Sequence, residues 1–434
     1  MIPYEIIKKK RDGQDLSKDE IEFMIMGYVR GEIPDYQMAA FLMAIFFRHL
    51  NERERALLTE IMARSGDMID LSDIGGRIVD KHSSGGVGDK TTLVVAPMVA
   101  SLGIPIAKMS GRALGHTGGT IDKLESIPGL KTSLTLDQFK ENVKKFGIAI
   151  AGQTGKLAPA DKKIYALRDA TATVDEISLI AASIMSKKLA GGADAFVLDV
   201  KVGSGAFMKE LSQAKELAQA MVGIGKAHGK ETVALITNMH EPLGKYVGNS
   251  LEVIEAIEAL KGIHDERFMA LCLEIASYMV ELSGKMSREK AKDALRQNLE
   301  NGKALEKFRD LVRAQGGDER VIDNPWEFLP VAEKKIDFKA KKSGYITNID
   351  TEKIGIASIM LGAGRKKKED IIDHSVGLKI LKKLGDEVSS GDTIAVIYAS
   401  ENSDVESALK LLEEAYIIDD VRPEKPPMIY EVIK

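Results

Sequence analysis

Residues Asp80 to Thr92 read DKHSSGGVGDKTT and bring together cations, a titratable ring, hydroxyl groups and three glycines. A phosphate group needs several amide or hydroxyl donors that converge on it, and glycine lets backbone amides approach closely. A helix that begins near Thr91 would point its positive end at the same place. These residue types indicate an anion site with an acid/base group beside it. The alternative is a glycine-rich turn that only joins a strand to a helix.

The common nucleotide-binding patterns do not match this loop. Asp89 stands where the P-loop requires glycine before its lysine, and Gly86-Val87-Gly88 lacks the third glycine of the dinucleotide fingerprint. We therefore predict that this loop binds an anion of the size of phosphate. Its sequence does not indicate a site for ATP or NAD.

A second loop, KMSGRALGHTGGTIDKLES from Lys108 to Ser126, has a similar composition. It places Lys108, Ser110, Thr117 and Thr120 among four glycines. Loops at the carboxyl ends of neighbouring parallel strands line one crevice. Two such loops in one crevice favour a functional site over two unrelated turns.

Each of the two loops contains one histidine. His82, beside the predicted anion site, could move a proton near neutral pH, whereas His116 is expected to order its own loop. No histidine pair has H-x-x-x-H spacing, so histidine ligation of a metal is not expected. The remaining histidines are expected to be structural or solvated: His49, His228, His240, His264 and His374.

A third stretch, APADKKIYALRDATATVDEISLIAASIMSKK, contains Tyr165, Arg168, Ser183 and Lys187. Ser183 and Lys187 are four residues apart and therefore share one face of a helix. Together with Arg168 they could hold a planar ring that carries carbonyl oxygens and an N–H group. The alternative is a surface helix with ordinary salt bridges.

Short apolar runs precede both loops and predict strands at 77–80 and 104–110, with a helix at 91–102 between them. Strand, loop, helix and strand form a βαβ unit, which implies a parallel sheet. Further strands are expected at 147–153, 195–203 and 232–239.

The remainder of the chain divides into helical and mixed segments. Residues 1 to about 66 read as helices, and SKDE at Ser17 and NERE at Asn51 have capping-box spacing. After about Pro330, short strands with glycine and aspartate turns predict a small α+β domain. GDEVSSGDTIAVI there resembles a barrel-sandwich hammerhead, and no lysine stands in the context that such carrier domains modify.

The composition excludes several classes of protein. A length of 434 residues predicts two or three domains, and a net charge of −4 argues against a general nucleic-acid binder. The single cysteine, Cys272, excludes an intramolecular disulfide framework. No apolar run of membrane-spanning length and no signal-peptide pattern is recognised, so we expect a cytoplasmic protein without membrane partners.

Four segments resemble the thymidine and pyrimidine-nucleoside phosphorylase family, and the pyrimidine-nucleoside branch most closely: KHSSGGVGDKTT, SGRALGHTGGTIDKLESIPG, GQTGKLAPADKKIYALRDATATVD and DVKVGSGAFM. The resemblance extends over nearly the whole chain. It implies reversible phosphorolysis in nucleoside salvage, in which a pyrimidine nucleoside and inorganic phosphate give free base and α-D-pentose 1-phosphate. No organic cofactor is implied.

The resemblance also implies an α/β fold in three parts. A small all-α domain would comprise 1–70 and 160–193, and a phosphate-binding α/β domain with a mixed, mainly parallel sheet would comprise 75–155 and 194–330. A C-terminal α+β subdomain of hammerhead type would comprise 335–434. The family forms homodimers, and the cleft between its first two domains closes during turnover.

Carried over by position, the phosphate ligands would be Lys81, Ser83, Thr92, Lys108, Ser110 and Thr120. The base would be held by Arg168, Ser183 and Lys187, with Tyr165 and Leu114 lining its pocket. His82 would be the acid/base between base and sugar, while Arg168 and Lys187 stabilise charge on the departing pyrimidine.

Two positions bear on specificity and on metal use. Lys108 resembles the broad branch, so both uridine and thymidine are expected as substrates. The potassium site of bacterial relatives maps onto Gly88, Leu243, Tyr246 and Glu255. Those relatives commonly have threonine at position 90, where this chain has Lys90, whose ammonium could replace the ion.

Three other functions stay open: a thymidine-restricted phosphorylase, a transferase like anthranilate phosphoribosyltransferase, and a non-catalytic nucleoside-binding protein. The transferase would need a site for pyrophosphate and magnesium, usually with paired acidic residues. KHSSGG with Arg168 and Lys187 does not supply such a site. A binding protein would keep the binding residues but would not need His82.

Overall fold

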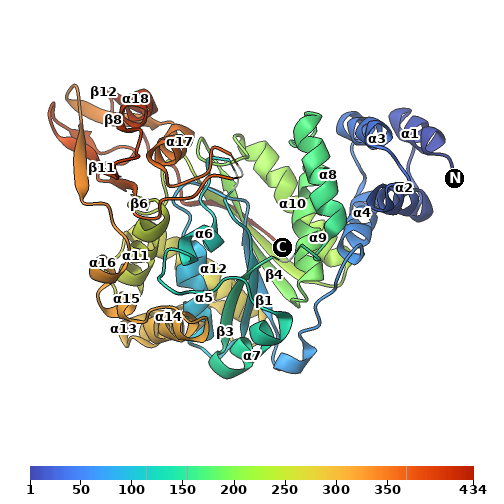
Figure 1. The fold of residues 1–434 in the computed structure, drawn as a ribbon, viewed down its shortest axis with the longest axis horizontal. Helices are drawn as coiled ribbons and strands as arrows, with labels where there is room; N and C mark the ends of the chain where they lie inside the picture. The colour runs from blue at the N-terminus through green and yellow to red at the C-terminus, as the bar shows by residue number, and fades with distance from the viewer. Residues whose placement is uncertain (114, 154, 368) are drawn as a thin grey trace.

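The computed structural model describes residues 1–113, 115–153, 155–367 and 369–434. Helices at the start of the chain pack together at one end of the molecule (Figure 1): α1 (Pro3–Arg11), α2 (Lys18–Arg30), α3 (Asp35–Arg48) and α4 (Glu52–Arg64). Ser17 and Asn51 cap α2 and α4, and Glu20 and Glu54 complete the two predicted capping boxes.

Two later helices, α8 (Pro159–Ala170) and α9 (Ile177–Ala190), lie against this N-terminal group. Pro159 stands in the first turn of α8, where its missing N–H costs no hydrogen bond. Leu179 of α9 shares the apolar core of the N-terminal helices, whereas Met185 and Leu189 pack in the core beside the sheet. Helix α9 therefore belongs to both cores, and the boundaries predicted at 160 and 193 stay a prediction.

The central sheet has the order β1-β4-β5-β13. Its strands are β1 (Val79–Ser83), β4 (Ala195–Val202), β5 (Glu231–Asn238) and β13 (Ile429–Ile433). The first three are parallel and β13 is antiparallel to β5, so the sheet is mixed and mainly parallel, as predicted. A parallel pair, β2 (Ile106–Ser110) and β3 (Ile148–Gly152), completes the strands of the βαβ units.

Strand β1 differs from its prediction. The sequence pattern ends the strand at Asp80, but the strand continues to Ser83 because it pairs with β4 through Asp199. Lys81 and His82 therefore lie in the strand itself, and the loop that follows is shorter than expected.

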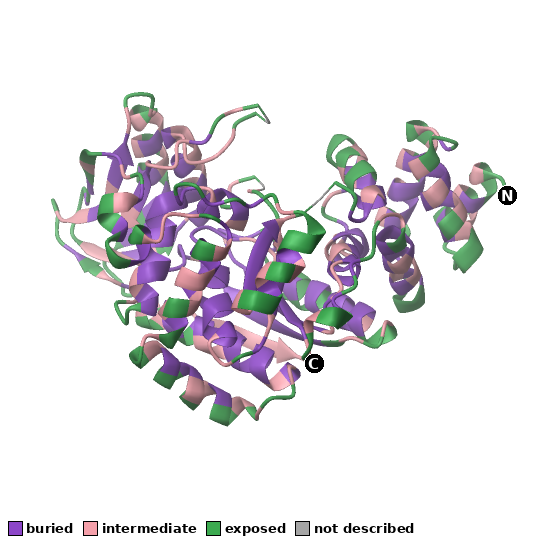
Figure 2. Cartoon of the chain, turned by 60° about the horizontal axis from the view of Figure 1, so that its bottom comes forward, coloured by how far each residue is buried: buried purple, intermediate pink, exposed green. Residues whose placement is uncertain are grey.

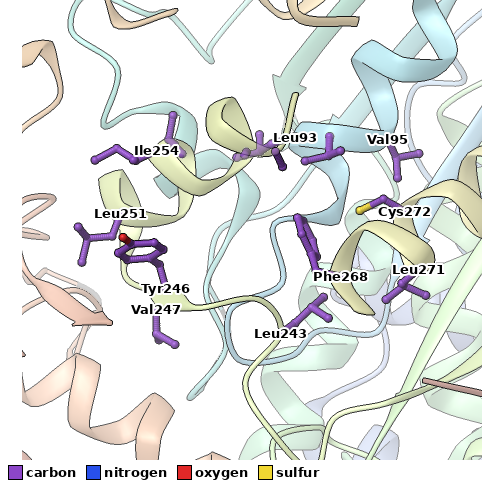
Figure 3. Packing of buried hydrophobic residues seen from close by; sticks show 14 of the residues in the cluster. Leu93, Val95, Leu243, Tyr246, Val247, Leu251, Ile254, Phe268, Leu271 and Cys272 are labelled. Atoms are coloured by element: carbon purple, nitrogen blue, oxygen red, sulfur yellow. The ribbon is translucent and has the colours of Figure 1, made fainter. Parts of the chain in front are cut away.

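Helices cover the sheet, which lies largely buried among them (Figure 2). All residues of α5 (Thr91–Ala100) are buried, in keeping with a sequence that is apolar on every face. Figure 3 shows Leu93 of α5 in one core with residues of α11 and α12. The other helices here are η1 (Ser72–Ile74), α6 (Thr120–Leu124), α7 (Leu136–Phe146), α10 (Leu211–Ala227), α11 (Asn249–Leu260), α12 (Glu266–Leu282), α13 (Arg288–Glu300), α14 (Lys303–Ala314), α15 (Arg320–Asp323) and α16 (Pro325–Phe328).

The C-terminal part is α+β, as predicted, and its sheets are antiparallel. One sheet contains β6 (Tyr246–Val247), β9 (Gly377–Ile380), β11 (Thr393–Ala399) and β7 (Lys334–Lys339). The other contains β10 (Glu387–Val388), β8 (Gly344–Ile349) and β12 (Tyr416–Asp419). Helices α17 (Thr351–Leu361) and α18 (Val405–Ala415) pack beside them.

The end of the chain leaves this C-terminal part. Within the range predicted as one subdomain, 335–434, residues 429–433 return to the central sheet as β13 and cover the edge of β5. The local sequence cannot indicate this return, because the pairing partner lies far away in the chain. Among the described residues, no helix combines the length and apolar character needed to cross a bilayer.

Candidate active site

A cavity of about 830 Å³ lies where the loops after β1, β2 and β3 face helices α8 and α9. All three loops follow the carboxyl ends of parallel strands, which is where ligands bind in open α/β sheets. The cavity thus brings together the three stretches that the sequence pattern singled out.

Five of the six residues expected to hold phosphate line the loop side of this cavity: Ser83, Thr92, Lys108, Ser110 and Thr120. His82, the expected acid/base, lines it as well. Lys81 is not among the described lining residues. Its Nζ lies 2.5 Å from Oγ1 of Thr91 and 3.6 Å from a carboxylate oxygen of Asp199, and the side chain is buried. Lys81 therefore supports the first loop from behind.

Asp89 also lines the cavity, which the sequence pattern did not predict. The hydroxyl of Ser83 donates to its carboxylate at 2.5 Å, and Thr91 donates both its amide (3.1 Å) and its hydroxyl (2.6 Å). Burial by itself would raise the pKa of Asp89, but Lys81, Lys201 and Lys123 outweigh it and hold that pKa well below its usual range.

A buried charge network lies beneath the loops. Asp80 pairs with Lys188 at 2.6 Å and with Lys108 at 3.3 Å, and Lys108 also donates to the carbonyl oxygen of Lys81. Burial lowers the pKa of Lys108 to about 8; Asp80 opposes that shift, and Lys188 and Lys81 add to it. The cation on this side of the cavity can therefore lose its charge at mildly alkaline pH.

The same lysines control His82. Burial, and then the positive charges of Lys188, Lys108, Lys81 and Lys187, lower the pKa of His82 well below its usual value. The imidazole is therefore neutral at neutral pH. The other loop histidine, His116, lies 3.1 Å from the carbonyl oxygen of Gly205, and so contacts a loop other than its own.

Helices α8 and α9 supply the opposite side of the cavity, with Tyr165, Arg168, Ser183 and Lys187. Arg168 is 1% exposed and donates to the carbonyl oxygens of three residues, Thr173 (3.2 Å), Leu179 (3.2 Å) and Val174 (2.5 Å). A guanidinium has five N–H groups, so donors remain for a ligand. Leu114, the other predicted lining residue, lies outside the described residues.

Lys187 is held by a residue that the sequence analysis missed. Its Nζ lies 2.5 Å from Oδ2 of Asp161 and 3.1 Å from Oγ of Ser183. Asp161 lines the same cavity and is buried. The segment that contains it, PADKK, has an ordinary composition, and 26 residues separate Asp161 from Lys187.

Lys90 lies among the residues at which the sequence analysis placed a possible potassium site. Its Nζ donates to the carbonyl oxygens of Leu243 (2.9 Å) and Tyr246 (2.8 Å) and to Glu255 (2.5 Å). The ammonium is fully buried, and Gly88 has a φ of 74° and packs against the Leu243 carbonyl. A metal ion does not fit beside this side chain, because the oxygen atoms that would hold it already bind the ammonium.

Comparisons with known proteins agree with this architecture. Residues 4–66 match the helical bundle domain and residues 75–305 the a/b domain of a glycosyl transferase family. Residues 345–419 match the pyrimidine nucleoside phosphorylase C-terminal domain. The anthranilate phosphoribosyltransferase of Thermus thermophilus has a similar fold, with a TM-score of 0.57 at 18% identity over 71% of this chain and 99% of its own. Fold and domain matches together define a glycosyl transferase with a helical bundle and an α/β domain.

Curated relatives narrow this class. The pyrimidine-nucleoside phosphorylase of Geobacillus stearothermophilus is 54% identical over 430 residues, or 99% of each chain. That of Staphylococcus aureus strain USA300 is 53% identical over the same share of both chains. The chain belongs to the pyrimidine-nucleoside phosphorylase family.

Proposed function

We propose that this protein catalyses the reversible phosphorolysis of pyrimidine nucleosides, in cytoplasmic nucleoside salvage. The observation that carries the proposal is that one cavity joins hydroxyl and cationic groups of two glycine-rich loops to Arg168, Ser183 and Lys187. The first set suits an oxyanion, and the second suits a ring with carbonyl oxygens. Uridine, thymidine and deoxyuridine are the expected substrates, with inorganic phosphate as co-substrate.

The reaction needs a nucleophile and a leaving group on opposite faces of the sugar. A phosphate oxygen attacks the anomeric carbon, the glycosidic bond breaks, and its electron pair leaves with the base. The ammonium of Lys187 and the guanidinium of Arg168 stabilise the charge that develops on the departing pyrimidine. The proton that hydrogen phosphate gives up as the ester forms ends on the free base, so atoms and charge balance.

His82 can take part in that proton transfer only after phosphate binds. Burial and the surrounding lysines together keep the imidazole neutral, through the lowered pKa of His82. A phosphate dianion placed among the same lysines offsets their charge and raises that pKa. We therefore expect His82 to take up the proton that hydrogen phosphate gives up and to donate it towards the departing base.

The test of this function is phosphate-dependent release of uracil from uridine, followed by ultraviolet absorbance. Release is also expected with arsenate in place of phosphate, since the arsenate ester hydrolyses. A protein that binds nucleoside but releases no base with either anion would be a binding protein. Activity on thymidine alone would identify the restricted phosphorylase, against the expectation from Lys108.

We further propose that the enzyme needs no potassium ion. The support is Lys90, whose ammonium binds Leu243, Tyr246 and Glu255 where the relatives' ion would lie. Equal turnover in potassium chloride and in tetramethylammonium chloride is expected. A loss of turnover in the organic salt that returns on adding potassium would contradict this.

The assembly that we propose is a homodimer. Large apolar side chains are exposed on the N-terminal helices, including Tyr36 (74%) and Phe47 (70%), which lie eleven residues apart on one face of α3. Ile2 and Tyr4, also exposed, lie at the N-terminal end of the neighbouring helix α1. Sedimentation equilibrium should give twice the chain mass, and Phe47→Glu should shift the equilibrium towards monomer. A wild-type monomer at micromolar concentration would exclude the dimer.

A further inference from the structure

Lys123 joins three elements beneath the site without lining the cavity. It lies in α6, three residues after Thr120, and its side chain is 1% exposed. Its Nζ donates to the backbone carbonyl oxygen of Asp89 at 2.6 Å and lies 2.7 Å from Oε2 of Glu252 in α11. The ammonium of Lys123, which belongs to the second glycine-rich loop, therefore contacts both the first loop and helix α11.

The contact with the first loop falls at Asp89, near the end of the loop and two residues before α5 begins. The carboxylate of Asp89 receives the hydroxyl of Ser83 and the amide of Thr91, so Asp89 sets the position of both. Lys123 binds the backbone of that same residue. A displacement of Lys123 would therefore move the donors of the first loop relative to Thr120 of the second.

Helix α11 provides a rigid base for this contact. Leu251 and Ile254 of α11 are buried in the core that Figure 3 shows. Glu252 also accepts from the amide of Gly248 at 3.2 Å, which fixes its carboxylate. One turn later on the same helix, Glu255 binds Lys90 of the first loop.

The second loop leaves room for this lysine. A Cβ at Gly118 would lie 3.1 Å from Cε and 3.2 Å from Nζ of Lys123, and 3.6 Å from Glu252. Because position 118 is glycine, the backbone that lines the cavity can lie directly against the buried pair of Lys123 and Glu252. The cavity-lining backbone and the pair are in contact with no side chain between them.

From these contacts we infer that Lys123 and Glu252 are positioning residues for phosphate: they set the distance between the two glycine-rich loops. A single anion must meet donors from both loops at hydrogen-bond distance, so a relative shift of about 1 Å removes much of the binding. Neither residue touches the ligand. The inference rests on the proposed phosphate site. It adds the two residues that set the distance between the loops of that site.

The experiment compares Lys123→Met with a matched variant, Lys10→Met. Lys10 and Glu54 form an equally buried pair at 2.8 Å within the N-terminal helices, remote from the loops. In calorimetric titration with inorganic phosphate, the dissociation constant of Lys123→Met should be at least about tenfold higher than that of wild type. That of Lys10→Met should stay within about twofold of wild type. In steady-state assays the KM for phosphate should rise in Lys123→Met while the KM for uridine stays within about twofold.

Melting temperatures separate positioning from general stability. Both variants should lose stability, because each leaves a buried carboxylate without its partner. Equal phosphate affinity in Lys123→Met, Lys10→Met and wild type would overturn the inference while the proposed function stands. Wild-type protein that binds no phosphate would overturn both. Should Lys123→Met fail to fold, Glu252→Gln, which keeps the shape of the side chain, should still weaken phosphate binding, and unchanged binding there would equally overturn the inference.

Discussion

At the scale of single residues, we expect Lys108 to make phosphate binding depend on pH. With a pKa of about 8, its ammonium is charged below that pH and neutral above it. Near this pH phosphate is mainly a dianion. Its attraction to the side chain of Lys108 therefore falls as pH rises and the ammonium loses its charge. We expect the KM for phosphate to increase as pH passes through about 8, while the KM for uridine changes little.

The control for this prediction is Lys108→Met. That variant should show a high KM for phosphate throughout and lose the increase in the mildly alkaline range. An increase of the same size in the variant would assign the effect to another group.

Lys187 is the better residue for testing base stabilisation. Lys187→Ala should lower kcat by about 10²- to 10³-fold, the range found when one transition-state donor is removed. Lys187 is 22% exposed, so water can reach Asp161 once the ammonium is removed, and the fold should survive. The matched control is Lys144→Ala, which breaks an exposed pair with Asp73. Turnover of Lys187→Ala near the wild-type rate, measured with uridine at saturating phosphate, would remove this assignment.

Arg168 is less suitable for the same test. Its guanidinium bonds the carbonyl oxygens of Thr173, Val174 and Leu179. Arg168→Ala would leave these acceptors without a donor, at about 1–3 kcal/mol each when they are buried. A loss of turnover in Arg168→Ala would therefore reflect both unfolding and lost catalysis, and the assay would not separate the two.

At the scale of elements, Lys90 links the start of α5 to α11. Lys90→Thr should remove the ammonium and leave Glu255 facing two carbonyl oxygens. Without potassium, the free energy of unfolding should fall by about 3–5 kcal/mol, as when one partner of a buried pair is deleted. Added potassium should recover part of this loss in the variant and have no effect on wild type.

Thermal unfolding in potassium chloride and in tetramethylammonium chloride measures both effects. Equal melting temperatures of Lys90→Thr in the two salts would show that no ion replaces the ammonium.

At the scale of the whole molecule, the proposed phosphate ligands and the proposed base ligands come from different parts of the chain. The proposed phosphate ligands lie on loops of the α/β domain. The proposed base ligands lie on α8 and α9, which pack on the N-terminal helices. We propose that these parts close on the ligands during turnover, which would align them and exclude water. Phosphate and uracil together should reduce the radius of gyration in small-angle scattering more than either alone. Lys187→Ala should not respond to uracil, and an unchanged radius in wild type would argue for a site that is already closed.

Local patterns in the sequence determined a large share of this architecture. The capping boxes at Ser17 and Asn51, the apolar runs before the glycine-rich loops and the composition of those loops depend on neighbours within a few residues. Resemblance to the family then supplied the roles that such patterns cannot indicate, and full-length relatives confirm the family itself.

Only the tertiary structure decided which charges meet. It places Lys81 against Thr91 and Asp199, and Asp161 against Lys187. The pair of Lys90 and Glu255, 165 residues apart, is expected from the family resemblance alone, because no local pattern indicates it. The physical reason is the same in each case: a buried ion must find its counter-ion wherever the packed core places one, and that position has no local signature in the sequence.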